Sequence, residues 1–396
     1  MKSYVIDTNV VSPHMVPLAL ALRDLGVGDV KYVYTGVPSD RFRSSEVHEK
    51  IRGIAVSSPN NRTAIREFVE KADFALENVR DFDLMECRVA AGRPTAYSSE
   101  RWFKPIRIDA PQDSERAGGL GASVPGVLKL LLPSVLKRAR RLKRLLEGDG
   151  KFVYLANGVF AAEDVARMCG LLNGELRCLF RPPRLTFEKV PGGCVHAADG
   201  HDDLYCLDKI RLWGYFVEQG GKSLRKMAND GLKRVLWVGR MFGWKRLDTL
   251  INAVGGMDGF VLDIYGNGPD EARVKRWASR YSNVRVFDSV LLSEVRELMR
   301  THDVYVLSSN AFEGWGAVVN EALEEGMRVL GTYEAGACAT VLPESNLFHA
   351  GDWLTLRKML LAPIKEAGIG NWSVKNGARI LSQMANALGE GVSYGK

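Results

Sequence analysis

The segment "DVYVLSSNAFEGWGAVVNEALEEGM", residues 303–327, runs from an apolar strand pattern through a glycine-rich loop into a short helical pattern. It places Glu313 and Glu321 eight positions apart, with Gly314 and Gly316 between them. Glycines let the backbone approach a ligand closely, and the start of a helix offers unpaired N–H groups to an anion. Ionised carboxylates only accept hydrogen bonds and so suit hydroxyl groups. The segment therefore predicts a site for a phosphate group flanked by hydroxyl-bearing groups.

Two earlier segments repeat this strand-to-turn pattern. "RVLWVGRMFGWKRLDTLINAV" (234–254) carries Gly239, Arg240 and Lys245 in its turn, and "FVLDIYGNGPDEARV" (260–274) carries Gly266 and Gly268. Arginine binds a phosphate bidentately and lysine binds it as a point charge. Each turn alone would also suit an ordinary solvated loop. Together with residues 303–327, they predict a diphosphate site at the carboxyl edge of a parallel sheet.

Strand patterns alternate with helical patterns along most of the chain, which predicts an α/β fold with parallel sheets. The patterns are "YVIDTNVV", "KYVYTG", "KFVYLAN" and "ELRCLF" in the first half, then "RVLWVGR", "FVLDIYG", "VRVFDS", "DVYVLSS" and "MRVLGT". A chain of 396 residues is longer than one hydrophobic core usually supports. We predict two Rossmann-like, doubly wound domains, 1–218 and 219–370, with a helix at about 371–396 packing back on the first.

The second domain resembles the nucleotide-sugar domain of retaining GT-B glycosyltransferases of the large sucrose-synthase and mannosyltransferase-like family (family 4-like, group 1). The motifs "VGR", "KRLDTL" and "GNGP" and the Glu313–Glu321 pair carry this resemblance over about residues 232–345. It implies two domains facing across a cleft, with Arg240 and Lys245 on the diphosphate, Glu313 on the donor sugar and Glu321 on the ribose. The family's usual proline is replaced by Ser308, and its glycine-rich loop after the first strand is absent.

The resemblance implies transfer of a sugar from a UDP- or GDP-sugar to a saccharide or lipid-linked acceptor, with retention of configuration. Stabilising the departing diphosphate is the main electrostatic requirement, and we expect no cofactor and no metal. A nucleotide-sugar epimerase and a non-catalytic nucleotide-sugar-binding protein remain open alternatives. A nucleic-acid partner is not expected, because it would need a continuous basic stripe with aromatic platforms.

The first domain offers candidates for the acceptor side. His14 follows the first strand pattern, and Ser99, Glu100 and Arg101 follow another short strand. The patterns S-P-H-x-x-P-L-A, S-E-R-x-F-K and W-G-Y-F are similar to those of a subgroup of bacterial polysaccharide and capsule glycosyltransferases. A histidine at such a turn is also often structural.

The cysteines give no sign of disulfides or of a common metal motif. Six cysteines without a C-x-x-C pair indicate a reducing, cytoplasmic setting. Cys194, His196, His201 and Cys206 form C-x-H-x4-H-x4-C, which matches no common structural zinc spacing. The "HDD" at 201–203 lies outside the predicted nucleotide site, so no metal site is predicted.

A basic segment raises the question of a membrane. "KRARRLKR" (137–144) puts six positive charges into eight residues, beside apolar residues at helical spacing within 128–146. Such a helix suits the inner leaflet of a membrane, or a packed helix with a solvated basic face. Pro133 predicts where this helix begins. No apolar run is long enough to span a membrane.

Overall fold

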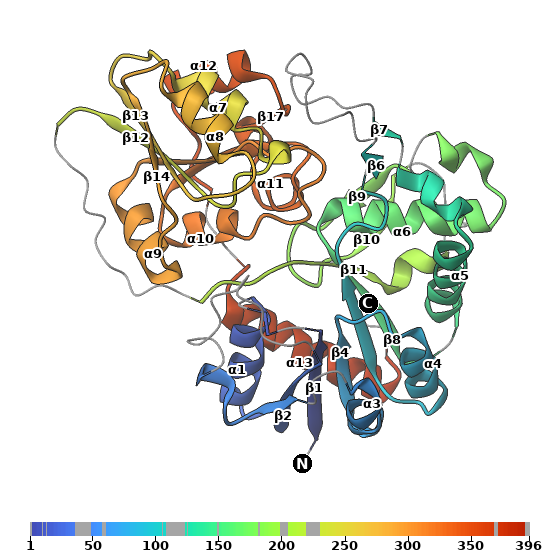
Figure 1. Ribbon diagram of the computed structural model, residues 1–396. Coiled ribbons are helices and arrows are strands. Elements are labelled where there is room, and N and C mark those ends of the chain that lie inside the picture. The colour runs from blue at the N-terminus through green and yellow to red at the C-terminus, as the bar shows by residue number, and fades with distance from the viewer. Residues whose placement is uncertain are drawn as a thin grey trace. The chain divides into compact units, whose positions relative to one another are not determined.

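The computed structural model describes residues 2–9, 11–12, 14–35, 49–57, 61–104, 106–107, 123–124, 126–148, 150–180, 183–198, 205–218, 230–367 and 371–392 (Figure 1). Contacts divide the chain into two units. The first unit comprises Met1–Phe103, Gly126–Glu218 and Asn371–Lys396, and the second comprises Lys104–Pro125 and Gln219–Gly370. The described residues between 104 and 124, expected in the first domain, group with the second unit. Their short strands β6 (Ile106–Arg107) and β7 (Ser123–Val124) pair with each other and not with the large sheet of the first unit.

The first unit is built on a seven-stranded parallel sheet in the order β11-β8-β5-β4-β1-β2-β3. Its strands are β1 (Ser3–Thr8), β2 (Asp29–Tyr34), β3 (Ala55–Ser57), β4 (Phe74–Glu77), β5 (Thr95–Ser99), β8 (Phe152–Asn157) and β11 (Ile210–Trp213). The central strands are buried along their whole length, because helices cover both faces of such a sheet.

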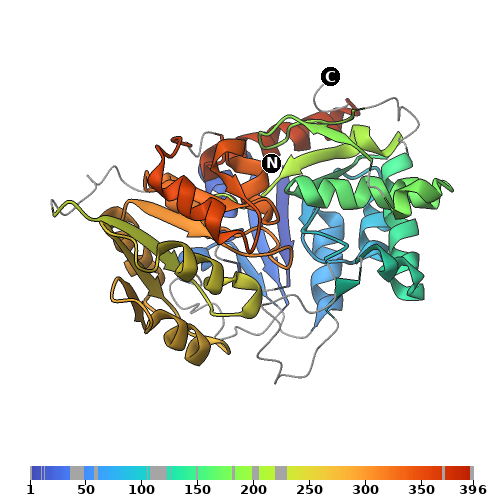
Figure 2. The same cartoon turned by 90° about the horizontal axis from the view of Figure 1, so that it is seen from above.

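Six helices whose bounds are fully described accompany this sheet. They are α1 (Val16–Asp24), α3 (Arg62–Lys71), α4 (Phe82–Ala90), α5 (Pro133–Glu147), α6 (Val159–Leu172) and α13 (Val374–Glu390). The last of them, α13, packs against α1 at the other end of the chain, as Figure 2 shows from above. Val217 and Ser373 form a parallel bridge at its start, and Gly377 leaves room for the ring of Phe216. The C-terminal helix is thus part of the first unit.

The second unit has a six-stranded parallel sheet in the order β14-β13-β12-β15-β16-β17. The strands are β12 (Lys233–Val238), β13 (Phe260–Tyr265), β14 (Val284–Phe287), β15 (Val304–Leu307), β16 (Arg328–Thr332) and β17 (Leu347–Phe348). The helices are α7 (Leu247–Val254), α8 (Glu271–Ala278), α9 (Leu292–Thr301), α10 (Val318–Glu324), α11 (Gly336–Val341) and α12 (Trp353–Leu361). The five strands expected in this half are confirmed.

One expected strand is wrong. "ELRCLF" forms a short 3-10 helix, η3 (Leu176–Leu179), after α6. Gly174 takes a left-handed conformation (φ 91°) and ends the preceding helix, and the chain continues along the surface. Leu176 and Phe180 are 74% and 82% exposed, so their apolar side chains do not join a sheet. The expectation that the basic helix begins at Pro133 is confirmed by the start of α5.

Candidate functional site

The candidate donor site lies where the strand order of the second sheet reverses. Counted along the chain, its strands run 3-2-1-4-5-6, so the reversal falls between neighbours β12 and β15. Ligands of open α/β sheets bind outside the carboxyl ends of the strands at such a point. The turns with Gly239 to Lys245 and with Glu313 to Gly316 follow these two strands, and Gly266 follows β13 beside them. The fold therefore gathers the predicted donor residues at one edge.

The first two turns are held together by their backbones. Gly239 N–H donates to Tyr265 O at 3.0 Å, and Met241 N–H donates to Asn267 O at 2.7 Å. A Cβ atom on Gly266 would lie 1.8 Å from Gly239 O, and one on Gly268 would lie 2.5 Å from Met241 O. Glycine is needed at both positions because the chains approach too closely for any side chain.

Lys245 and Glu313 form an ion pair at the centre of this edge. Both side chains are mostly buried, at 17% and 14% exposed. The Ser309 hydroxyl donates to the same Glu313 carboxylate oxygen at 2.9 Å, and the Ser308 hydroxyl donates to Lys245 O at 2.7 Å. The residue that replaces the family's proline, Ser308, thus ties the loop after β15 to the loop after β12. Ser309 is a contact that motif spacing did not single out.

Arg240 differs from Lys245 in having no acidic partner among the described residues. It is exposed, and its guanidinium lies 4.9 Å from the centre of the Phe242 ring. That ring stacks on Trp244 at 4.2 Å and 7°. The aromatic pair supports the arginine, and because the residue is exposed, its N–H groups are accessible to an anion.

Glu321 lies in α10, a helix of seven residues that ends at Glu324. It is half-buried, and burial raises the pKa of its carboxyl group. Arg296 donates to the Glu321 main-chain oxygen at 3.2 Å and pairs with Glu325 at 2.9 Å. Within the described part of the chain, no hydrogen bond reaches the Glu321 carboxylate, so its oxygens can accept from a ligand. Gly316, at φ 89°, begins the turn into this helix.

In the first unit, the structure joins two of the acceptor-side candidates through a residue that was not proposed. The His14 ring stacks on Tyr215 at 4.9 Å and 19°, and the Tyr215 hydroxyl donates to Glu100 at 3.0 Å. Burial lowers the pKa of His14 to about 4, because the charged imidazolium loses its solvation. Tyr215 belongs to the "WGYF" pattern, which was its only sequence signal.

The other two candidates have mainly structural contacts. The Ser99 hydroxyl is hydrogen-bonded to the Tyr154 hydroxyl at 2.8 Å and accepts from Trp102 at 3.2 Å, in a buried setting. Arg101 pairs with Asp164 at 3.6 Å and lies 4.8 Å from the ring of Phe160. Ser99 is therefore enclosed by the core, and Arg101 is held against α6.

Sequence comparison finds a family match within the second unit. Residues 224–360 match the family described as glycosyl transferases, group 1. This range contains every predicted donor residue. No curated protein sequence matches the chain.

Structural comparison gives the fold of the whole chain. HepE from Anabaena, in complex with UDP, superposes with a TM-score of 0.56 at 13% identity over 98% of both chains. AviGT4, a glycosyltransferase involved in avilamycin A biosynthesis, superposes with a TM-score of 0.54 at 14% identity over 99% of both chains. The lipopolysaccharide outer core galactosyltransferase WaaB superposes with a TM-score of 0.53 at 12% identity, over 98% of this chain and 95% of the WaaB chain. The fold is GT-B. The α/β prediction of two Rossmann-like halves is confirmed.

The basic helix α5 uses its apolar side within the first unit. Ala139, Leu142 and Leu146 are buried in the core there. Part of its charge is neutralised at the surface, since Arg141 pairs with Asp83 and Glu86. None of the described helices combines the length and apolar character that crossing a bilayer requires.

Proposed function

We propose that this protein transfers a sugar from a nucleotide diphosphate sugar to a saccharide or lipid-linked acceptor, with retention, in polysaccharide or glycoconjugate biosynthesis. In this proposal Arg240 and Lys245 stabilise the departing diphosphate, Glu313 holds the donor sugar and Glu321 holds the ribose. Gly239, Gly266, Gly268, Gly314 and Gly316 form the turns whose backbone faces the donor. A phosphate oxygen of the leaving group can take the acceptor proton, so the reaction needs neither a metal nor a separate base.

The observation that carries the proposal is the Lys245–Glu313 pair at the strand-order reversal, within residues that match the glycosyl transferases, group 1 family. A cation beside an acceptor-only group suits a ligand that presents phosphate and hydroxyls next to each other. A uridine donor is favoured because HepE, which shares the fold, was crystallised with UDP-glucose.

Donor binding is the first test. A panel of UDP- and GDP-sugars should include one that raises the melting temperature, because a ligand at a hundred times its Kd adds about 2.7 kcal/mol. For a unit of this size that corresponds to roughly 5–10 °C. Stabilisation by no nucleotide sugar would contradict the proposal.

Turnover separates the proposal from its rivals. A transferase consumes the donor faster when an acceptor is present and releases the nucleoside diphosphate. An epimerase would isomerise the donor with no acceptor, and a binding protein would leave it intact. Product anomers, read by NMR, test retention.

A lipid-linked acceptor, reached in the cytoplasm at the inner leaflet, is supported by the surface of α5. Lys137 and Arg140 are exposed there, and Leu131 just before the helix is 79% exposed. Each basic residue near an anionic surface contributes about 1 kcal/mol. We expect sedimentation with anionic vesicles at low salt, weakened about tenfold or more by Lys137→Gln with Arg140→Gln. Lys375→Gln in α13 is the control. Wild-type protein that ignores anionic vesicles at every salt concentration would indicate a soluble acceptor.

A further inference from the structure

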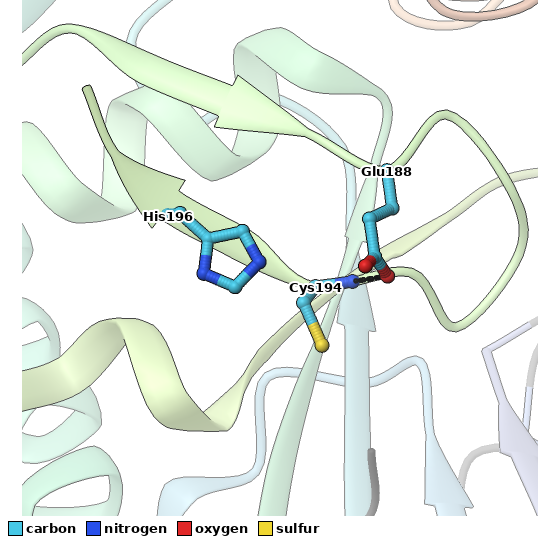
Figure 3. A group of neighbouring side chains, drawn as sticks. All are labelled: Glu188, Cys194 and His196. Carbon is cyan, nitrogen blue, oxygen red and sulfur yellow. Dashed lines mark hydrogen bonds between the residues drawn. The ribbon is translucent and has the colours of Figure 1, made fainter. Parts of the chain in front are cut away.

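A small hairpin in the first unit brings three metal-ligating side chains together. It consists of β9 (Leu185–Phe187) and β10 (Val195–Ala197), paired antiparallel with Val195 opposite Phe187. Glu188 N–H donates to Cys194 O at 3.1 Å, which continues the same register by one pair. Residues opposite each other, and residues two apart on one strand, share a face. Glu188, Cys194 and His196, called the hairpin cluster below, therefore lie on one face (Figure 3).

The opposite face of the hairpin is packed. Val195 is buried in the core of the first unit, with Phe187 against it. The hairpin turn is also fixed to the large sheet, because Gly192 N–H donates to Leu212 O at 2.7 Å and Leu212 N–H donates to Gly193 O at 2.9 Å. The cluster thus stands on a backbone anchored to the edge strand β11.

The ligand atoms of the three residues are close enough to share one ion. They all lie within 4.8 Å of one another, and a tetrahedral zinc with its usual bond lengths needs about 3.5 Å between ligand atoms. Glu188 and His196 are exposed, so small side-chain rotations can close this difference. Cys194 N–H donates to one Glu188 carboxylate oxygen at 3.0 Å, which holds that carboxylate beside the thiol and leaves its other oxygen available.

We propose that the hairpin cluster binds one Zn²⁺ through Cys194 Sγ, a His196 ring nitrogen and a Glu188 carboxylate oxygen, with water as the fourth ligand. Thiolate, imidazole and carboxylate together are a ligand set that zinc prefers. The ion would join β9 to β10 and stabilise the native first unit, in which the cluster is assembled. The proposal is independent of the sugar-transfer chemistry, because the predicted donor residues belong to the second unit.

The hairpin cluster differs from the pattern of Cys194, His196, His201 and Cys206 in the sequence, which matches no common zinc spacing. Cys206 is buried in the same core as Cys169, and it is not part of the cluster. His201 and the neighbouring aspartates lie outside the described residues. Glu188 takes their place, and it escapes spacing arguments because it comes from the other strand of the hairpin.

The test measures Zn²⁺ binding to the full-length protein after chelator treatment, by competition with a chromophoric zinc indicator. We expect one equivalent of tight binding and a rise in melting temperature. Cys194→Ser should weaken binding by more than about a hundredfold, and His196→Ala or Glu188→Gln by at least about tenfold. Cys87→Ser is the matched control, since Cys87 is an exposed free thiol elsewhere in the first unit.

Co²⁺ provides a second reading of the same site. The wild-type complex should show the thiolate charge-transfer band and the intense visible bands of a tetrahedral ion, and Cys194→Ser should lose the charge-transfer band. The metal-free melting temperatures of Glu188→Gln and His196→Ala show whether these exposed substitutions leave the fold intact. The proposal is overturned if wild-type protein binds no Zn²⁺, if Cys194→Ser binds it as well as wild type, or if Cys87→Ser loses it equally.

Discussion

Replacing Lys245 by alanine separates what its ion pair does for stability from what its charge does for the donor. Lys245 and Glu313 are 17% and 14% exposed. An exposed ion pair contributes about 0–1 kcal/mol, whereas removing one partner of a fully buried pair costs about 3–5 kcal/mol. The burial of this pair lies between those limits, so Lys245→Ala should destabilise the protein by about 1–3 kcal/mol. At roughly 2–4 °C per kcal/mol for a unit of this size, the melting temperature should fall by roughly 2–12 °C.

The effect on transfer is expected to be separate and larger. A lost group of this kind costs about 2–4 kcal/mol in the transition state, or roughly 30- to 1000-fold in kcat/KM. The double variant Lys245→Ala with Glu313→Gln distinguishes the two effects. It removes the unpaired carboxylate, and the Ser309 hydroxyl can still donate to the amide oxygen. The free energy of unfolding should therefore recover by about 1 kcal/mol or more, which is roughly 2–4 °C in melting temperature, while kcat/KM stays low.

The measurements are differential scanning fluorimetry on the four proteins of the cycle and initial rates with the donor found in the screen. If the double variant melts no higher than Lys245→Ala, the unpaired Glu313 is not what destabilises that variant. If Lys245→Ala keeps the wild-type kcat/KM, Lys245 does not act on the leaving diphosphate, and the proposed mechanism fails at its main residue.

Three further predictions follow from single positions. Glu321→Gln should weaken UDP or GDP binding about tenfold, because the amide replaces one acceptor oxygen by a donor that faces a hydroxyl. If calorimetry shows an unchanged affinity, Glu321 does not bind the ribose. Gly266→Ala should lower the free energy of unfolding by about 2 kcal/mol or more, because its Cβ meets the Gly239 carbonyl. Gly259→Ala is the control: with φ 76° and no atom within 4 Å of its Cβ, it should cost only about 1 kcal/mol of backbone strain. Equal melting temperatures of the two variants would show that the close approach is not the cause. Burial lowers the pKa of His14 to about 4, so the folded protein keeps this residue neutral at pH values where the unfolded chain protonates it. As the pH falls from 6.5 to 4, the unfolded chain therefore binds more protons than the folded protein, and the folded protein loses stability. His14→Phe should therefore gain stability relative to wild type between pH 7.5 and pH 5 by on the order of 1–2 kcal/mol in urea unfolding; a difference that does not change with pH would contradict this.

Local sequence patterns predicted the strands of the second unit better than those of the first. The strands of the second unit alternate with amphipathic helices, and glycines mark its turns, although the close approach that requires Gly266 and Gly268 is made to a turn 27 positions earlier in the chain. The segment "ELRCLF" shows the limit, because a short apolar run has the same pattern in a strand and in one turn of 3-10 helix. Only its exposure at the surface decides between them.

The sequence by itself determined the alternation of strands and helices, and with it the α/β class and the group of residues at the strand ends. Only the tertiary structure decided which side chains meet. Lys245 reaches Glu313 across 68 positions, and Tyr215 reaches Glu100 across 115. Glu188 joins Cys194 and His196 through the register of a hairpin. The first two pairings depend on strand order, which is set by many weak contacts between distant parts of the chain. The third depends on the register of a short hairpin, and spacing along the sequence does not encode either.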